Sequence, residues 1–389
     1  MNIGFVTTWL NRGAAYVTRA YIASLSEGNQ IYVYARGGEV EEKGRDEWDQ
    51  NFVTWGTRSH FGIPTYIIWP DFKKWVISNR LDVIIFNEQQ SWDIILKCIN
   101  LGVKIGTYVD YYTRDTVPFF ELFDFLLCNT QRHFGVFKHY PQCYFIPWGT
   151  DCVLYSGESP KPSNGLVTFF HSCGMSPNRK GTDLLIKSFH EIKGPTRLVI
   201  HSQVPLKDPE LKNILSLDDR ITLLVDTVGP PGLYHMGDVY VYPTRLEGIG
   251  LTIAEALASG LPVITADNGP MNEFVVHGLN GRLVKTCKCQ KREDNYYWDE
   301  CECDPKSLED AMKFYIDHPE NLRQQKINAR KFAVEKLDWR INSSGLLKLI
   351  IGSKLLPKSR TLINRVALYE YSRYPGLVFQ ALRRKLRSL

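Results

Sequence analysis

Short apolar runs alternate with longer amphipathic stretches along most of the chain, and this pattern restricts the fold more than any other feature. Strands that alternate with helices form βαβ units, whose mainly parallel sheets are covered by helices on both faces. The amphipathic stretches 15–25 and 92–101 are expected to be helices. The strands expected in the first half of the chain are 3–7, 31–35, 83–86, 105–109, 125–129 and 144–147. The pattern therefore predicts an α/β protein with a doubly wound sheet.

The alternation stops near residue 150 and then starts again. Residues 155–165 hold two prolines, two glycines and several serines, which is the composition of a linker. The strands expected after it are 166–171, 197–201, 221–225, 239–243 and 262–266. With 389 residues the chain is also longer than one core usually supports. We therefore expect two doubly wound domains, at 1–150 and 151–335, followed by a basic helical tail at 336–389.

The composition excludes the disordered and fibrous classes, because 44% of the residues are hydrophobic and 23% are charged. No apolar run approaches the roughly 20 residues that a membrane-spanning helix needs. The first residues enter a strand at once, which leaves no room for a signal peptide. These features predict a cytoplasmic protein whose nine cysteines are reduced thiols.

The most informative segment is 240–264, with the sequence YVYPTRLEGIGLTIAEALASGLPVI. A strand is expected to end at Pro243, and a helix is expected to begin near Leu251 after a glycine-containing loop. Gly248 and Gly250 allow the backbone to come close to a ligand. The free N–H groups and the positive end of the helix dipole then point at that ligand. The segment therefore predicts an anion site.

Two carboxylates, Glu247 in the loop and Glu255 in the helix, accompany this predicted anion site. Ionised carboxylates accept strong hydrogen bonds from sugar and ribose hydroxyls. The pair therefore indicates a ligand with an anionic centre and polyol groups on both sides, which is the form of a nucleotide sugar.

The pattern P-x-x-x-E-G-x-G-L-x-x-x-E-A-x-A-x-G-x-P-V resembles the E-x7-E signature of the retaining GT-B glycosyltransferases, in particular glycosyltransferase family 4. The flanking segments 146–151, 232–239, 267–273 and 277–284 are also similar to that family, and before 146 the resemblance is mostly architectural. It implies two Rossmann-like domains that face each other across a cleft. It also implies transfer of a sugar, with retention, from a nucleotide diphosphate donor to a glycan, a lipid-linked glycan or another acceptor, with no cofactor required.

Lys180, which opens an amphipathic helix, resembles the family's lysine that holds the donor diphosphate. A fixed cation there stabilises the negative charge that builds up as the nucleotide leaves. The family's usual arginine near residue 174 is absent, and Arg179 is the candidate replacement. The chain has no Asp-x-Asp motif, so no metal–diphosphate site is expected. The resemblance assigns the diphosphate to Lys180 and the amides of Gly250 and Leu251, the transferred sugar to Glu247 and the ribose to Glu255.

Two residues of the first domain are further candidates. Gly13 lies in the loop after the first strand, where GT-B enzymes place a glycine-rich loop, although an ordinary strand-to-helix turn also explains it. Asp110 follows the strand expected at 105–109, where many family members have a histidine. It is expected either to bind a donor or acceptor hydroxyl or to cap local backbone.

Two C-x-C pairs flank residues 290–300, and a hairpin would bring their thiols together. Four thiolates suit a structural zinc ion, and a hairpin of reduced cysteines is the alternative. The four residues are Cys287, Cys289, Cys301 and Cys303.

Positive charge is concentrated at the C-terminal end, where residues 341–389 contain ten Lys or Arg and one acid, Glu370. Basic residues interleaved with apolar ones fit an amphipathic segment on an anionic membrane surface. The family resemblance offers another reading, in which the C-terminal helices cross back onto the first domain. Nucleic acid is not an expected partner, because the excess charge is confined to the tail and no binding motif is present.

Two other functions remain compatible with the fold. One is a GT-B binding or scaffold protein without catalytic activity, for which the missing arginine and Asp110 argue. The other is a different GT-B reaction, such as phosphorolysis or sugar-nucleotide epimerisation.

Overall fold

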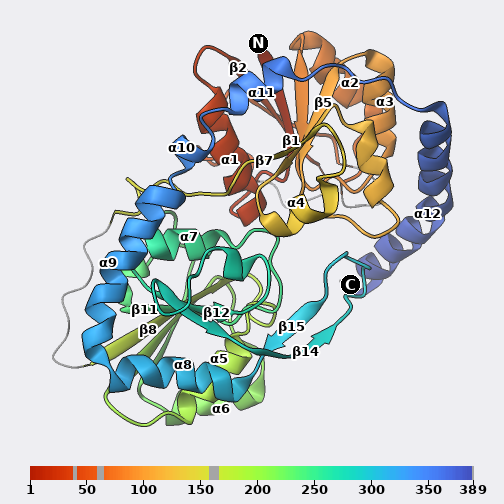
Figure 1. Ribbon diagram of the computed structural model, residues 1–389. Helices are drawn as coiled ribbons and strands as arrows, with labels where there is room; N and C mark the ends of the chain where they lie inside the picture. Colours follow the sequence, from red (N-terminus) through yellow and green to blue (C-terminus); the bar gives the residue numbers. More distant parts are fainter. Residues whose placement is uncertain (38–41, 59–64, 157–165, 388–389) are drawn as a thin grey trace. The chain divides into compact units, whose positions relative to one another are not determined.

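The computed structural model describes residues 1–37, 42–58, 65–156 and 166–387. The chain forms two compact units. One consists of Met1–Ile146 together with Ser343–Leu389, and the other of Pro147–Asn342. Figure 1 shows each unit as a sheet flanked by helices.

The first unit contains a seven-stranded parallel sheet in the order β3-β2-β1-β4-β5-β6-β7. Its strands are β1 (Asn2–Thr7), β2 (Gln30–Ala35), β3 (Val53–Trp55), β4 (Val83–Phe86), β5 (Lys104–Tyr108), β6 (Phe125–Cys128) and β7 (Cys143–Phe145). Its helices are α1 (Gly13–Leu25), α2 (Trp69–Ser78), α3 (Asp93–Leu101), η1 (Val117–Leu122), α4 (Gln131–Phe137), α11 (Leu346–Gly352) and α12 (Arg360–Arg387). All four apolar residues of β4 are buried, as expected for a parallel strand covered on both faces.

The second unit contains a six-stranded parallel sheet in the order β10-β9-β8-β11-β12-β13. Its strands are β8 (Val167–Gly174), β9 (Thr196–Ser202), β10 (Ile221–Val225), β11 (Val239–Tyr242), β12 (Val263–Ala266) and β13 (Gly281–Val284). Its helices are α5 (Thr182–His190), α6 (Pro209–Leu217), η2 (Tyr234–Met236), α7 (Leu251–Ala258), η3 (Met271–Glu273), α8 (Pro305–Asp317), α9 (Pro319–Lys336) and α10 (Trp339–Asn342). The strand order reverses between β8 and β11, and ligands of such sheets bind at the carboxyl ends of the strands near that point.

The predicted doubly wound architecture is confirmed, with two Rossmann-like α/β domains. Strands β3 and β13 were not expected, because neither is a continuous apolar run: Thr54 interrupts the first, and the second begins with Gly281 and Arg282. The boundary lies between residues 146 and 147, ahead of the linker expected at 155–165. Residues 157–165 of that linker lie outside the described part of the chain. Thr150 pairs with Asp338, so the chain joins the second unit before the linker begins.

The C-terminal segment from residue 343 belongs to the first unit. The Lys104 ammonium donates to the carbonyl of Ile350 at 3.0 Å, and Lys358 pairs with the buried Asp124 at 2.7 Å. No helix in the described part of the chain is both long enough and apolar enough to cross a bilayer.

The C-x-C pairs form an antiparallel hairpin of β14 (Thr286–Gln290) and β15 (Glu300–Cys303). The register places Cys289 directly opposite Cys301, with Cα atoms 4.0 Å apart, and a disulfide joins the two. The expectation of nine reduced thiols is therefore wrong for this pair. The four-thiolate zinc site is also not formed, because two of its four sulfurs are bonded to each other. Among the described residues, no group of three or more His, Cys, Asp or Glu could hold a metal ion.

Candidate active site

The loop between β11 and α7 carries Glu247 and ends at Gly250, whose φ of 90° lies in the left-handed region that glycine adopts without steric cost. Helix α7 begins at the next residue, Leu251. The first N–H groups of a helix have no acceptor within it, and they carry the positive end of the helix dipole. The predicted loop and helix start are therefore present, with the local geometry of the anion sites found at helix N-termini.

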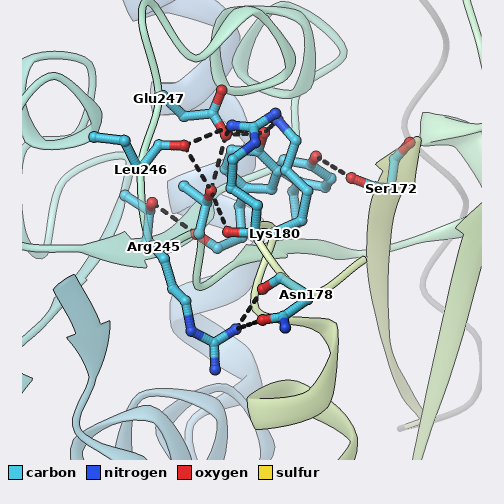
Figure 2. A network of polar contacts seen from close by, with 11 residues as sticks. Ser172, Asn178, Lys180, Arg245, Leu246 and Glu247 are labelled. Carbon is cyan, nitrogen blue, oxygen red and sulfur yellow. Dashed lines mark hydrogen bonds and ion pairs between the residues drawn. The ribbon is translucent and has the colours of Figure 1, made fainter. Parts of the chain in front are cut away.

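Glu247 is the centre of a buried polar cluster, which Figure 2 shows from close by. Its Oε1 accepts hydrogen bonds from the Lys180 ammonium at 2.6 Å and from Arg179 at 3.0 Å. The hydroxyls of Tyr242 and Thr244 donate to the same oxygen, each at 2.8 Å. Within the described residues, the hydrogen bonds of this carboxylate all go to Oε1. The other oxygen, Oε2, is therefore available to a ligand hydroxyl.

The cluster contains two cations and one carboxylate. Burial alone would raise the pKa of Glu247, but Arg179 and Lys180 hold it at about 2. Burial lowers the pKa of Lys180 to about 8, and the nearby positive charge of Arg179 acts in the same direction. At neutral pH all three groups are charged, which leaves one net positive charge beside the start of α7. This electrostatic arrangement favours an anionic ligand.

Short-range contacts hold the loop that carries Lys180 against the loop that carries Glu247. The carbonyl of Arg179 accepts from the Thr244 hydroxyl at 3.1 Å, and its guanidinium donates to the carbonyl of Leu246 at 2.6 Å. Gly181 has a φ of 70°, and a Cβ at this position would lie 2.1 Å from the carbonyl oxygen of Pro243. Only glycine permits this approach between the two loops.

Glu255 lies in α7, and its carboxylate is held by tyrosines. The Tyr234 hydroxyl donates to Oε2 at 2.6 Å, and Tyr155 is a second hydrogen-bond partner. Burial raises the pKa of Glu255, while these two hydrogen bonds and the charge of Lys180 oppose the rise. Glu255 is therefore a positioned acceptor near the same cluster.

The structure brings the predicted residues of the second unit together, and it places Gly13 and Asp110 in the other unit. Gly13 is the first residue of α1, which follows β1. Asp110 lies two residues after the end of β5 and is half-buried. Because β1 and β5 run in the same direction in the sheet, both residues lie at its carboxyl edge.

Four residues that contact the site were not predicted as site residues. Tyr242 and Thr244 bind Glu247, Tyr234 binds Glu255, and Arg245 contacts the loop that carries Lys180. Tyr242 could have been found from the sequence, because it ends a strand that lies where the strand order reverses, and ligands bind at the carboxyl ends of such strands. Tyr234 had no signal, because only the fold brings it to α7.

The fold is that of the GT-B glycosyltransferases, which consists of two Rossmann-like domains. HepE from Anabaena, solved in complex with UDP and glucose, has a TM-score of 0.70 and 17% sequence identity, over 90% of this chain and 100% of that one. Sucrose-phosphate synthase from Thermosynechococcus elongatus has a TM-score of 0.66 and 16% identity, over 90% and 98% of the two chains.

Residues 167–292 match the family model described as Glycosyl transferases group 1. The lipopolysaccharide core biosynthesis mannosyltransferase LpsB of Rhizobium meliloti is 33% identical over 120 residues, which are 27% of this chain and 33% of that protein. The corresponding mannosyltransferase LpcC of Rhizobium leguminosarum is 31% identical over 133 residues, or 32% and 37% of the two chains. These matches therefore span about a third of each relative's own length.

Proposed function

We propose that the protein is a glycosyltransferase that moves a sugar from a nucleotide diphosphate donor to a glycan, a lipid-linked glycan or another hydroxyl acceptor, with retention of configuration. The observation that carries this proposal is the convergence of Lys180 and Arg179 on Glu247 beside the start of α7. The family match over this unit supports it, as does the UDP-glucose complex of the structurally similar HepE.

The second unit has side chains or backbone groups for each of the three parts of the donor, which are the diphosphate, the ribose and the transferred sugar. The diphosphate is bound by Lys180, Arg179 and the N–H groups of Gly250 and Leu251, which supply positive charge and hydrogen-bond donors. Glu255 accepts hydrogen bonds from the ribose hydroxyls. Glu247, ionised at neutral pH, accepts a hydroxyl of the transferred sugar at its free Oε2.

The reaction breaks the bond between the anomeric carbon and the phosphate oxygen, and negative charge grows on the leaving diphosphate. Lys180, Arg179 and the helix start stabilise that charge because they are fixed before the reaction begins. The acceptor oxygen forms the new bond on the face that the phosphate leaves. The departing phosphate takes the acceptor's proton, so no separate side-chain base is required.

Calorimetry with UDP, GDP, ADP and CMP and their common sugar conjugates tests the proposal on the wild type and on K180M, E247Q and E255Q. We expect one nucleotide series to bind, with K180M and E255Q each at least tenfold weaker. Product analysis with the bound donor tests transfer and stereochemistry. K187M removes a half-exposed lysine of the neighbouring helix and is the matched control. A folded wild type that binds no nucleotide would contradict the proposal, and binding without turnover would favour the scaffold function.

We also propose that the protein is cytoplasmic and that its basic C-terminal segment contacts an anionic membrane surface. Ile351, Leu368 and Tyr371 expose 58%, 68% and 81% of their surface, and basic residues such as Lys354 and Arg365 are exposed beside them in sequence. Apolar and basic groups on one segment suit an anionic bilayer. Co-sedimentation with phosphatidylserine vesicles, compared with neutral vesicles, is expected to show selective binding that L368E and Y371E abolish.

A further inference from the structure

Arg245 lies two residues before Glu247 in the same loop, and its side chain is buried, with only 7% exposed. A buried guanidinium is costly unless its charge is paired and its N–H groups are bonded. The proposed transfer reaction assigns it no role. The reason for burying this charge must therefore lie in the groups that Arg245 contacts.

The guanidinium of Arg245 binds three residues from two other segments. Nη1 and Nη2 donate to the two carboxylate oxygens of Asp183 at 2.8 and 2.7 Å, and Nε donates to Glu302 at 3.1 Å. Nη1 also donates to the backbone carbonyl of Asn178 and to its Oδ1, the latter at 3.1 Å. Figure 2 shows this side chain directed away from Glu247 and toward Asn178.

The backbone of Arg245 joins the same segments. Its N–H donates to the carbonyl of Arg179 at 2.8 Å, and its carbonyl accepts from the N–H of Cys301 at 2.9 Å. One residue thus connects the loop of Lys180, the loop of Glu247 and the hairpin of β14 and β15.

The planar guanidinium is suited to this junction because its donors form a rigid fork that matches a carboxylate. Asn178 and Asp183 lie on either side of Arg179 and Lys180. The guanidinium therefore binds both ends of the segment that carries the two cations. Without it, Asp183 would lose its bidentate partner, and the two ends of segment 178–183 would lose their side-chain bonds to the Glu247 loop, which leaves the contacts of Arg179 and Lys180 in its middle. Lys180 would then become more hydrated and less well aligned with the diphosphate.

We propose that Arg245 is a positioning residue for the donor diphosphate, which it does not touch: it holds Arg179 and Lys180 in place against Glu247. This inference rests on the proposed function, since it concerns the same donor site. It adds the hairpin to that site, because Glu302 and Cys301 bind Arg245 from β15.

The test measures the affinity for UDP, GDP and ADP between pH 6.5 and 9.5, and the donor KM and kcat, for the wild type, R245M and R245K. We expect R245M to raise the Kd and the donor KM at least tenfold while kcat changes less. We also expect the pH above which affinity declines to move upward from about 8, because a better hydrated Lys180 keeps its proton longer. R245K retains the charge without the fork and is expected to restore only part of the affinity.

R220M is the matched control, because Arg220 also forms a bidentate pair, with Asp218, elsewhere in the same unit. It is expected to lower the Tm without changing the pH profile. D183N keeps the Arg245 guanidinium but weakens its bidentate pairing with residue 183. This variant tests the proposal if R245M does not fold. Wild-type affinity and an unchanged pH profile in R245M, or in D183N where R245M does not fold, would overturn the inference. A wild type that binds none of the three nucleotides would instead contradict the proposed function, and the inference would fail with it.

Discussion

Glu247 and Lys180 illustrate how burial and charge act together on single residues. Glu247 is buried, yet its pKa is about 2 because two cations bind its Oε1. Lys180 is only 14% exposed, and desolvation lowers its pKa to about 8 although a carboxylate lies 2.6 Å away. The cluster therefore stays charged at neutral pH. As the pH rises, Lys180 is the first of its groups to lose its charge.

We predict that nucleotide affinity declines as the pH rises above about 8. Lys180 has a lowered pKa in the free protein, and a bound diphosphate favours its charged form. Deprotonation of the free protein then competes with binding, and the Kd is expected to rise about tenfold per pH unit above this value. Calorimetry with UDP or GDP from pH 6.5 to 9.5 measures the effect. In K180R the decline is expected to disappear, because arginine stays protonated. A flat wild-type profile would show that Lys180 does not bind the diphosphate.

The elements of the second unit bring the site together through two close approaches, at Gly181 and at the hairpin of β14 and β15. The first sets the distance between the β8–α5 loop and the end of β11. The second joins β15 to the Glu247 loop through Arg245. Both are contacts between segments that are distant in sequence.

We predict that Gly181→Ala lowers both stability and nucleotide affinity. The new Cβ would lie 2.1 Å from the carbonyl oxygen of Pro243, and the left-handed φ of 70° adds roughly 1–2 kcal/mol for a residue with a side chain. The loop must shift, and Lys180 shifts with it. Urea unfolding and calorimetry measure the two effects. Gly229→Ala, whose Cβ would meet nothing within 4 Å, is the control in the same unit. Equal stability and affinity in the two variants would contradict the argument.

We predict that the protein, purified without reductant and denatured, has seven titratable thiols. Cys289 and Cys301 are paired, and the other seven cysteines are free. Treatment with a reductant is expected to raise the count to nine and to lower the Tm, since the disulfide closes a loop within the chain. Thiol titration and a thermal melt provide the measurements. Nine thiols before reduction would show that the pair does not form under these conditions.

At the scale of the whole molecule, the C-terminal segment completes the first unit rather than forming a separate domain. Lys358 and Asp124 lie 2.7 Å apart, with 7% and 1% of their side chains exposed. Asp124 also accepts the backbone N–H groups of Ile105 and Leu356, so the segment is tied to β5 through one carboxylate.

We predict that K358M destabilises the first unit by about 3–5 kcal/mol, because it leaves a buried carboxylate without its cation. Chemical unfolding, followed by the fluorescence of the first unit's tryptophans, measures the change. The double variant D124N/K358M is expected to recover part of the loss, since it removes the unpaired charge. A loss below about 1 kcal/mol would mean that water already solvates the pair.

The sequence by itself determined the α/β class, the strands of both sheets apart from β3 and β13, and the glycine-containing turn before α7. These features follow from local pattern, because buried strands, amphipathic helices and glycine-containing turns each leave a signal within a few residues. It also indicated Glu247, Glu255 and Lys180 as donor-site candidates, the roles that our proposal now gives them.

Only the tertiary structure decided which side chains meet. The partners of Glu247 and Glu255, the junction at Arg245, and the return of residues 343–389 to the first unit depend on contacts between distant segments. The Cys289–Cys301 disulfide depends on hairpin register, which a spacing of C-x-C pairs does not specify. Contacts of this kind leave no local periodicity in the sequence, because they arise where separate loops approach one another in the folded chain.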